Sequence, residues 1–196
     1  MENFPKKIAL YTGIAFVAMA ILGVWGNLTL QRALIEAPAP TLQQMRGVAW
    51  VLMAVAVLDV GTALGLHALT RTPARRASEL AAALRIAYAL ILAGLCLPLL
   101  SSPPQTALAV TTGFAAGWKV ALGLFGVHLI VLMVAALKAP VFPTWLAGLL
   151  GIAGAGYLTD AVLTVSGIAP DSTIAAFTFL GELLLIGWLF VKAFRA

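Results

Sequence analysis

Long apolar blocks separated by short polar segments follow one another along the whole chain. A helix of about 20 apolar residues is long enough to cross the hydrocarbon core of a bilayer, which is roughly 30 Å thick. The pattern therefore predicts an all-α fold, a polytopic transmembrane six-helix bundle forming one domain over residues 1–196. The expected spans are residues 8–30, 48–69, 80–100, 114–137, 144–165 and 173–194.

The composition supports the membrane assignment. Hydrophobic residues make up 62% of the chain and charged residues only 10%, far from the usage of soluble domains. The formal net charge of +5 would suggest a nucleic-acid partner in a soluble protein, but most of these basic residues stand at the ends of apolar blocks. We therefore expect the lipid bilayer as the partner, and no nucleic acid.

The basic residues also predict an orientation. Positive loops of membrane proteins face the cytoplasm. With the spans placed as above, Arg32 and Arg46 fall on one side and most other Lys and Arg fall on the opposite side. We expect a multi-pass protein of the cell (cytoplasmic) membrane with both termini in the cytoplasm. The residues of the predicted inner side are Lys6, Lys7, Arg71, Arg75, Arg76, Lys138, Lys192 and Arg195.

Two charges lie inside neighbouring spans, Asp59 in the second and Arg85 in the third, where Tyr88 shares the face of Arg85. An ionised side chain at the centre of a span costs roughly 2.5–3.5 kcal/mol on insertion scales. The cheapest compensation for each charge is the other, so the sequence predicts a buried ion pair. The pair could be a structural clamp or part of a proton or ligand site.

Further polar groups lie in the later spans. His128, in the fourth span, could take up a proton or bind a ligand, or be satisfied by a neighbouring helix. Asp160 and Glu182, with Tyr157 nearby, could form a second polar site in which two carboxyls share a proton. In the alternative, each acid is satisfied separately by Tyr157, Thr178, Asn27 or Lys119.

Several short pieces occur in a fixed order along these spans. They are Met45-Arg46-Gly47, Leu58-Asp59-Val60, Leu84-Arg85, Phe125-Gly126-Val127-His128, Pro143-Thr144-Trp145-Leu146-Ala147-Gly148, Gly156-Tyr157-Leu158-Thr159-Asp160, and Gly181-Glu182-Leu183 with Trp188. In their order and spacing the chain resembles a bacterial family of six-span membrane proteins catalogued as domain of unknown function 4386. The resemblance covers most of the chain; it implies the fold and no known reaction.

Three classes of function stay open. The first is small-molecule or proton-linked transport, or ligand binding, through a buried polar site; its candidate residues are Asp59, Arg85, Tyr88, His128, Tyr157, Asp160 and Glu182. The second is a membrane sensor or partner protein that uses the same groups as a structural ion-pair network. An intramembrane enzyme is the least favoured class, because the sequence shows neither a nucleophile beside a base nor a set of metal ligands. The sequence predicts no metal site, and it leaves the cofactor and the oligomeric state open.

Overall fold

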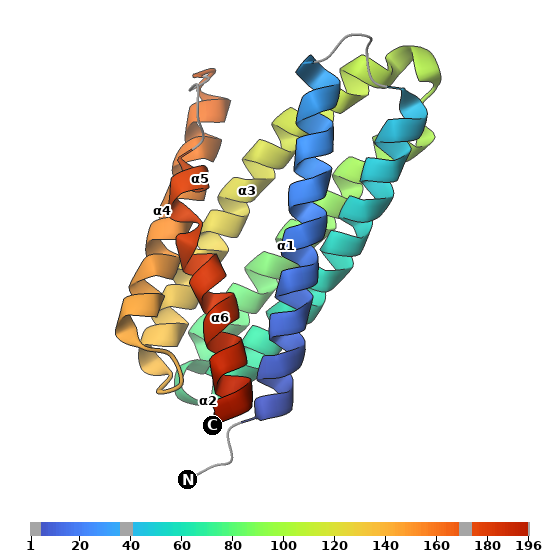
Figure 1. Ribbon diagram of the computed structural model, residues 1–196. Coiled ribbons are helices and arrows are strands. Elements are labelled where there is room, and N and C mark those ends of the chain that lie inside the picture. The colour runs from blue at the N-terminus through green and yellow to red at the C-terminus, as the bar shows by residue number, and fades with distance from the viewer. Residues whose placement is uncertain (1–4, 36–40, 169–173, 196) are drawn as a thin grey trace.

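The computed structural model describes residues 5–35, 41–168 and 174–195, and these residues form helices and short connections. The long helices lie side by side in one bundle, with both chain ends at the same end of it (Figure 1). The elements are α1 (Lys6–Ile35), α2 (Leu42–Ser101), the 3₁₀ helix η1 (Pro104–Thr106), α3 (Ala107–Lys138), α4 (Thr144–Val165), α5 (Ala175–Thr178) and α6 (Leu180–Arg195).

The helices confirm an all-α membrane fold. Four of them, α1 to α4, are long and apolar enough to cross a membrane. Large apolar side chains stay exposed on their outer surface, as contact with lipid tails requires, for example Ile21, Val57, Leu90, Leu137 and Val162. Six separate helices of span length were expected, and the structure differs from that expectation at α2 and after α4.

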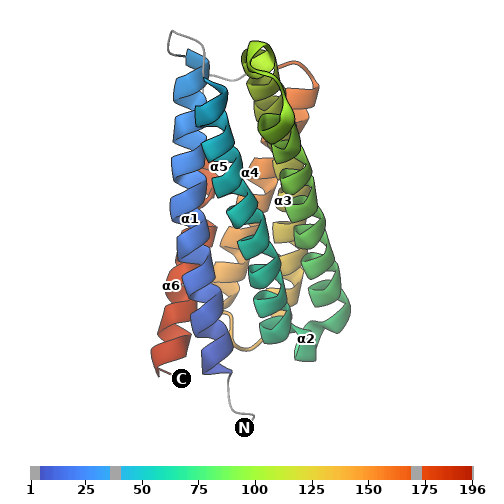
Figure 2. The ribbon, with the colours of Figure 1, turned by 90° about the vertical axis from the view of Figure 1, so that its right-hand side faces the viewer.

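Helix α2 contains both the second and the third expected spans. Its 60 residues are interrupted at Ala74, whose φ and ψ of −143° and 46° are not helical. Pro73, just before it, has no backbone N–H to donate to the preceding turn. The two arms fold back against each other, and Arg46 Nε near the start of α2 donates to the carbonyl of Leu100 near its end, at 3.2 Å. Figure 2 shows the arms as a hairpin.

A chain of side-chain hydrogen bonds closes this hairpin at its turn. Ser78 Oγ lies 2.9 Å from His67 Nδ1 and 2.7 Å from Thr70 Oγ1, and the Thr70 hydroxyl donates to the carbonyl of Leu66 at 2.8 Å. Ser78 and Thr70 are fully buried. The expected loop of residues 70–79 is therefore a tight, internally bonded turn.

Two helices, α2 and α3, begin earlier than expected, and neighbouring residues account for each start. Thr41 caps α2: its hydroxyl accepts from the N–H of Gln44, and Gln44 Oε1 accepts from the N–H of Thr41. Helix α3 starts at Ala107 rather than near residue 114, directly after η1. The connection between the first two expected spans includes residues 36–40, which lie outside the described residues.

The last expected span is divided in two. Helix α5 ends at Thr178, Phe179 forms a turn, and α6 begins at Leu180 and runs for 16 residues. Helix α5 stays with α4, whereas α6 packs against both α1 and α4. Trp188 of α6 donates to the carbonyl of Val141 at 2.8 Å and fixes the lower part of α6 to the connection before α4. Residue 173, the expected start of this span, lies outside the described residues.

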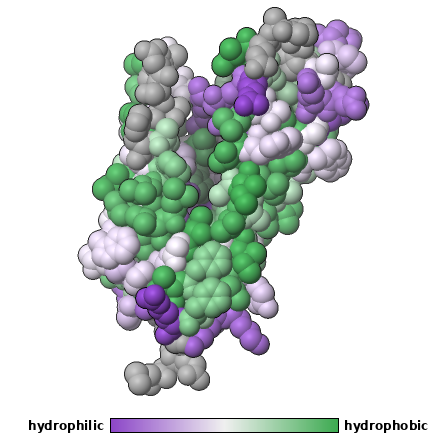
Figure 3. All heavy atoms as spheres, in the orientation of Figure 1, coloured by the Kyte–Doolittle hydropathy of each residue, from purple (hydrophilic) through white to green (hydrophobic). Residues whose placement is uncertain are grey.

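A cleft separates α1 from the arm formed by α4 and α5. It opens at the end of the bundle opposite the chain termini, and hydrophilic surface borders its open end (Figure 3). Below the cleft, α6 fills the space between α1 and α4. The division at Phe179 thus marks the change from an open to a closed part of the bundle.

Helices α3 and α4 cross where two glycines face each other. A methyl group on Gly126 would lie 2.5 Å from the carbonyl oxygen of Gly154, and one on Gly154 would lie 2.5 Å from the carbonyl oxygen of Gly126. A methyl carbon cannot approach a carbonyl oxygen that closely. Small residues at this crossing are therefore required for the two backbones to touch.

We expect Gly126→Ala and Gly154→Ala each to destabilise the protein by about 1–3 kcal/mol, because the added methyl group forces α3 and α4 apart. Thermal unfolding in detergent measures the effect. Gly148→Ala on α4 is the matched control, since nothing lies within 4 Å of its added methyl group. An equal loss of stability in all three variants would contradict the close crossing.

Candidate functional site

The predicted ion pair is confirmed. Arg85 NH2 lies 2.7 Å from Asp59 Oδ1, and the two side chains are 0% and 2% exposed. The atoms are in ionic contact, but their angles do not form a hydrogen bond, and Asp59 Oδ1 has no hydrogen-bond partner among the described residues. The two arms of the α2 hairpin thus bring opposite charges together in the core.

His128 of α3 completes the surroundings of the guanidinium. Its Nδ1 lies 2.8 Å from the carbonyl oxygen of Ala81, and a carbonyl only accepts, so we assign the ring hydrogen to Nδ1. Nε2 then offers a lone pair to Arg85 NH1 at 3.3 Å. In this tautomer His128 is neutral, and Arg85 carries the positive charge of the pair.

Two aromatic rings hold the guanidinium on its faces. Arg85 Cζ lies 4.8 Å from the ring centre of Phe16 on α1 and 5.0 Å from that of Phe125 on α3. Both distances are within the range of a cation–π interaction. Met19 Sδ of α1 adds a long contact of 3.7 Å to Arg85 NH2. Arg85 therefore ties α1, α2 and α3 together.

Phe125 lies at the centre of an aromatic group. Its ring centre is 5.2 Å from that of Tyr88, 5.3 Å from Tyr157 and 5.5 Å from His128. The Tyr88 hydroxyl also accepts a hydrogen bond from Trp118 Nε1 at 3.0 Å. Sequence reasoning missed Phe125 and Phe16 as site residues. For Phe125 the signal was its position three residues before His128, which puts both on one helix face; Phe16 lies in a uniformly apolar helix and gave none.

Glu182 belongs to the same buried region. It lies in the first turn of α6, close to Tyr157 of α4 and within range of the charges of Asp59 and Arg85. No oriented hydrogen bond joins it to Tyr157, and its Oε1 is buried without a hydrogen-bond partner among the described residues. Gly181, next to it, touches the backbone of Leu149, which fixes this turn against α4.

Asp160 has a different role from Glu182. Its Oδ1 accepts from the N–H of Ile174 at 2.9 Å and its Oδ2 from the N–H of Ala175 at 2.8 Å, so its carboxylate holds the start of α5 against α4. The structure therefore groups Asp59, Arg85, Tyr88, His128, Tyr157 and Glu182, and sets Asp160 apart.

One further ion pair lies at the hairpin turn, outside the core. Arg75 Nε donates to Glu79 Oε1 at 2.8 Å. This hydrogen bond holds the pKa of the Glu79 carboxyl below its usual value. The pair is exposed, so it contributes little to stability and serves as a reference for the buried pair.

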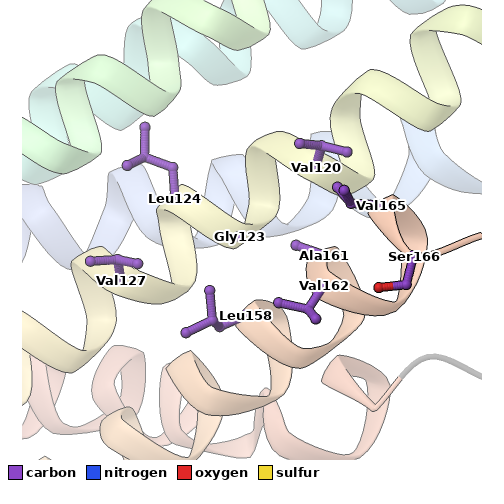
Figure 4. A pocket seen from close by; sticks show the side chains of 9 residues that line it. All are labelled: Val120, Gly123, Leu124, Val127, Leu158, Ala161, Val162, Val165 and Ser166. Atoms are coloured by element: carbon purple, nitrogen blue, oxygen red, sulfur yellow. The ribbon is translucent and has the colours of Figure 1, made fainter.

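A groove of about 440 Å³ runs along the outer surface between α3 and α4 (Figure 4). Its lining is apolar apart from the hydroxyl of Ser166, and it includes none of the six clustered polar residues. In addition, no group of three or more His, Cys, Asp or Glu in the described ranges is placed to hold a metal ion.

Comparisons with known proteins identify the family. The family described as Domain of unknown function (DUF4386) matches residues 11–193. The chain belongs to this family. Among similar proteins, one from Archaeoglobus fulgidus, described as "Uncharacterized protein", is 33% identical over 156 residues, which are 78% of this chain and 85% of that protein. No solved structure matches the chain significantly.

The DUF4386 match confirms the resemblance drawn from the short sequence pieces. It includes every residue of the buried cluster, from Phe16 on α1 to Glu182 on α6. The family description assigns no activity. What this DUF4386 member does has to be inferred from the chemistry of the cluster.

We expect a double-mutant cycle on Asp59→Asn and Arg85→Gln to reveal strong coupling. Each single change leaves a buried charge uncompensated and should cost about 3–5 kcal/mol, whereas the double variant should lose at least about 1 kcal/mol less than the sum. Unfolding of the detergent-solubilised protein measures the four stabilities. The cycle Arg75→Gln with Glu79→Gln is the exposed control, for which little coupling is expected; additive losses at Asp59 and Arg85 would remove the pair as a stabilising unit.

Proposed function

We propose that this membrane protein takes up protons, or a small polar solute together with protons, at its buried polar cluster and moves them across the bilayer. One observation carries the proposal: among the described residues, Arg85 Nε and Glu182 Oε1 are buried without hydrogen-bond partners, in the region of the Asp59–Arg85 ion pair. Folded proteins leave few such atoms, and each costs about 1–3 kcal/mol. Unsatisfied groups gathered in one region mark a place where something binds.

The proposal includes six crossings. A helix of 60 residues is about 90 Å long, three times the hydrocarbon thickness, and the hairpin at Ala74 divides α2 into two crossings. Helices α5 and α6 together supply the sixth. With the basic residues gathered at the end that carries both termini, this end would face the cytoplasm and the cleft would open outward.

The chemistry of the cluster fits proton transfer better than catalysis. It contains two carboxyls, a neutral imidazole and two phenols within one apolar core. Ionisable groups inside membrane spans are typical of proton relays and coupled transport. The cleft between α1 and the α4–α5 arm, open at one end of the bundle, supports entry from one side of the membrane (Figure 3).

A second function has its own supporting observation. Arg85 is surrounded by Asp59, His128 and the rings of Phe16 and Phe125, so most of its binding capacity is already used. Such a clamp would hold a sensor or partner protein in one shape, with signals leaving through its short cytoplasmic turns. In that case the cluster would transport neither protons nor a solute.

Proton flux into proteoliposomes separates these functions. With an imposed potassium-diffusion potential and a pH-sensitive dye inside the vesicles, we expect wild-type protein to acidify the interior faster than empty vesicles. The charge-balanced double variant Asp59→Asn with Arg85→Gln should lose most of this flux, because the cluster loses its ionisable pair.

Glu79→Gln, at the exposed turn, is the control and should transport as the wild type does. If folded wild-type protein moves no protons, alone or with a panel of charged and zwitterionic solutes, the transport proposal fails and the clamp is favoured.

A further inference from the structure

The two carboxyls of the buried cluster are not balanced in the same way. Asp59 has the guanidinium of Arg85 at 2.7 Å. Among the described residues Glu182 forms no salt bridge: the cation that acts on it is that same Arg85, already engaged by Asp59 and by His128. One positive charge therefore serves two acids.

Every group around Glu182 can be named by the helix that supplies it. Helix α2 supplies Asp59, Arg85 and Tyr88, and α4 supplies Tyr157. Helix α1 brings Phe16 and Met19 to the cluster, which carry no charge. With Glu182 ionised, these surroundings would hold a net charge of −1.

A surplus negative charge in an apolar core is expensive, and attraction from an already paired guanidinium only partly offsets the cost. A proton is the smallest species that removes it. Binding converts the carboxylate to a carboxylic acid by forming one O–H bond and breaks no other bond. The new O–H can donate to a hydrogen-bonding neighbour such as the Tyr157 hydroxyl, whereas a carboxylate can only accept.

Glu182 lies in the first turn of α6, directly after the turn at Phe179 where α5 ends. This junction of α5 and α6 is on the side of the bundle where the cleft separates α1 from the α4–α5 arm (Figures 1 and 3). Asp59 and Arg85 are buried in the core, where the rings of Phe16 on α1 and Phe125 on α3 cover the guanidinium. The position of α6 thus places the acid that lacks a cation on the side of the cleft.

We propose that Glu182 is the proton-loading group of this protein, exchanging protons through the cleft, while Asp59, Arg85 and His128 remain a fixed pair that positions the charge opposite it. Proton binding at Glu182 is inferred from the partners of the two acids: Asp59 is paired with Arg85, whereas Glu182 has no cation of its own among the described residues. Its use in transport rests on the function proposed above.

Infrared difference spectra between high and low pH test the inference directly, because a protonated carboxyl has a carbonyl stretch that a carboxylate lacks. Wild-type protein in lipid vesicles should show carboxyl bands appearing as the pH is lowered, and one of them should belong to Glu182. Glu182→Gln should lose that one band, and Glu182→Asp should retain it at a shifted position, while the other acids of the chain keep theirs. Glu79→Gln is the matched control and should lose only the band of the exposed Glu79, with the Glu182 band unchanged.

Two results would overturn the inference: wild-type and Glu182→Gln spectra with the same set of carboxyl bands, or a Glu182 band that fails to appear in the wild type at every pH at which the protein is folded. Should Glu182→Gln fail to fold, the shifted band of Glu182→Asp decides. Flux measurements separate the two proposals. Transport that is unchanged in Glu182→Gln refutes the loading role alone, whereas a titrating band without any flux refutes transport and leaves the proton site in place.

Discussion

The charged and aromatic residues of the buried cluster surround a single guanidinium, that of Arg85, which has no contact with water. Arg85 is fully buried, and the bundle compensates its charge with a carboxylate, an imidazole lone pair and two aromatic faces. These partners come from α1, from the first arm of α2 and from α3, and Arg85 itself lies on the second arm of α2. In a membrane the hydrophobic effect gives little force between helices, so such contacts, together with close packing, decide which faces meet.

The close crossing of α3 and α4 serves the same core. Gly126 stands between Phe125 and His128, and its contact with Gly154 lets Tyr157 come within reach of Phe125. A larger residue at either glycine would separate the ring that covers Arg85 from the tyrosine beside Glu182. Packing between backbones and electrostatics in the core are therefore coupled through neighbouring residues of one helix.

The sequence allowed the ion pair to be predicted because charges in adjacent apolar spans have few other ways to be neutralised. It could not identify Phe16, because no feature of the sequence distinguishes Phe16 from the other apolar residues of α1 as a neighbour of Arg85. Asp160 and Glu182 looked alike, as acids on small or polar helix faces. Their separation depends on the start of α5, where two backbone N–H groups occupy Asp160. Such a contact between distant segments leaves no periodic signal.

The division of the last span explains how Glu182 comes near Asp59 and Arg85. A continuous helix held to α4 along its whole length would follow α4 away from α1. Instead, Asp160 ties α5 to α4, while Gly181 and Trp188 fix α6 lower down, where it also packs against α1. The turn at Phe179 brings Glu182 toward Asp59 and Arg85 without giving it a cation. The same turn lies where α5, held to α4, gives way to α6, so the geometry that withholds a counter-charge from Glu182 also places it between the open and the closed part of the bundle.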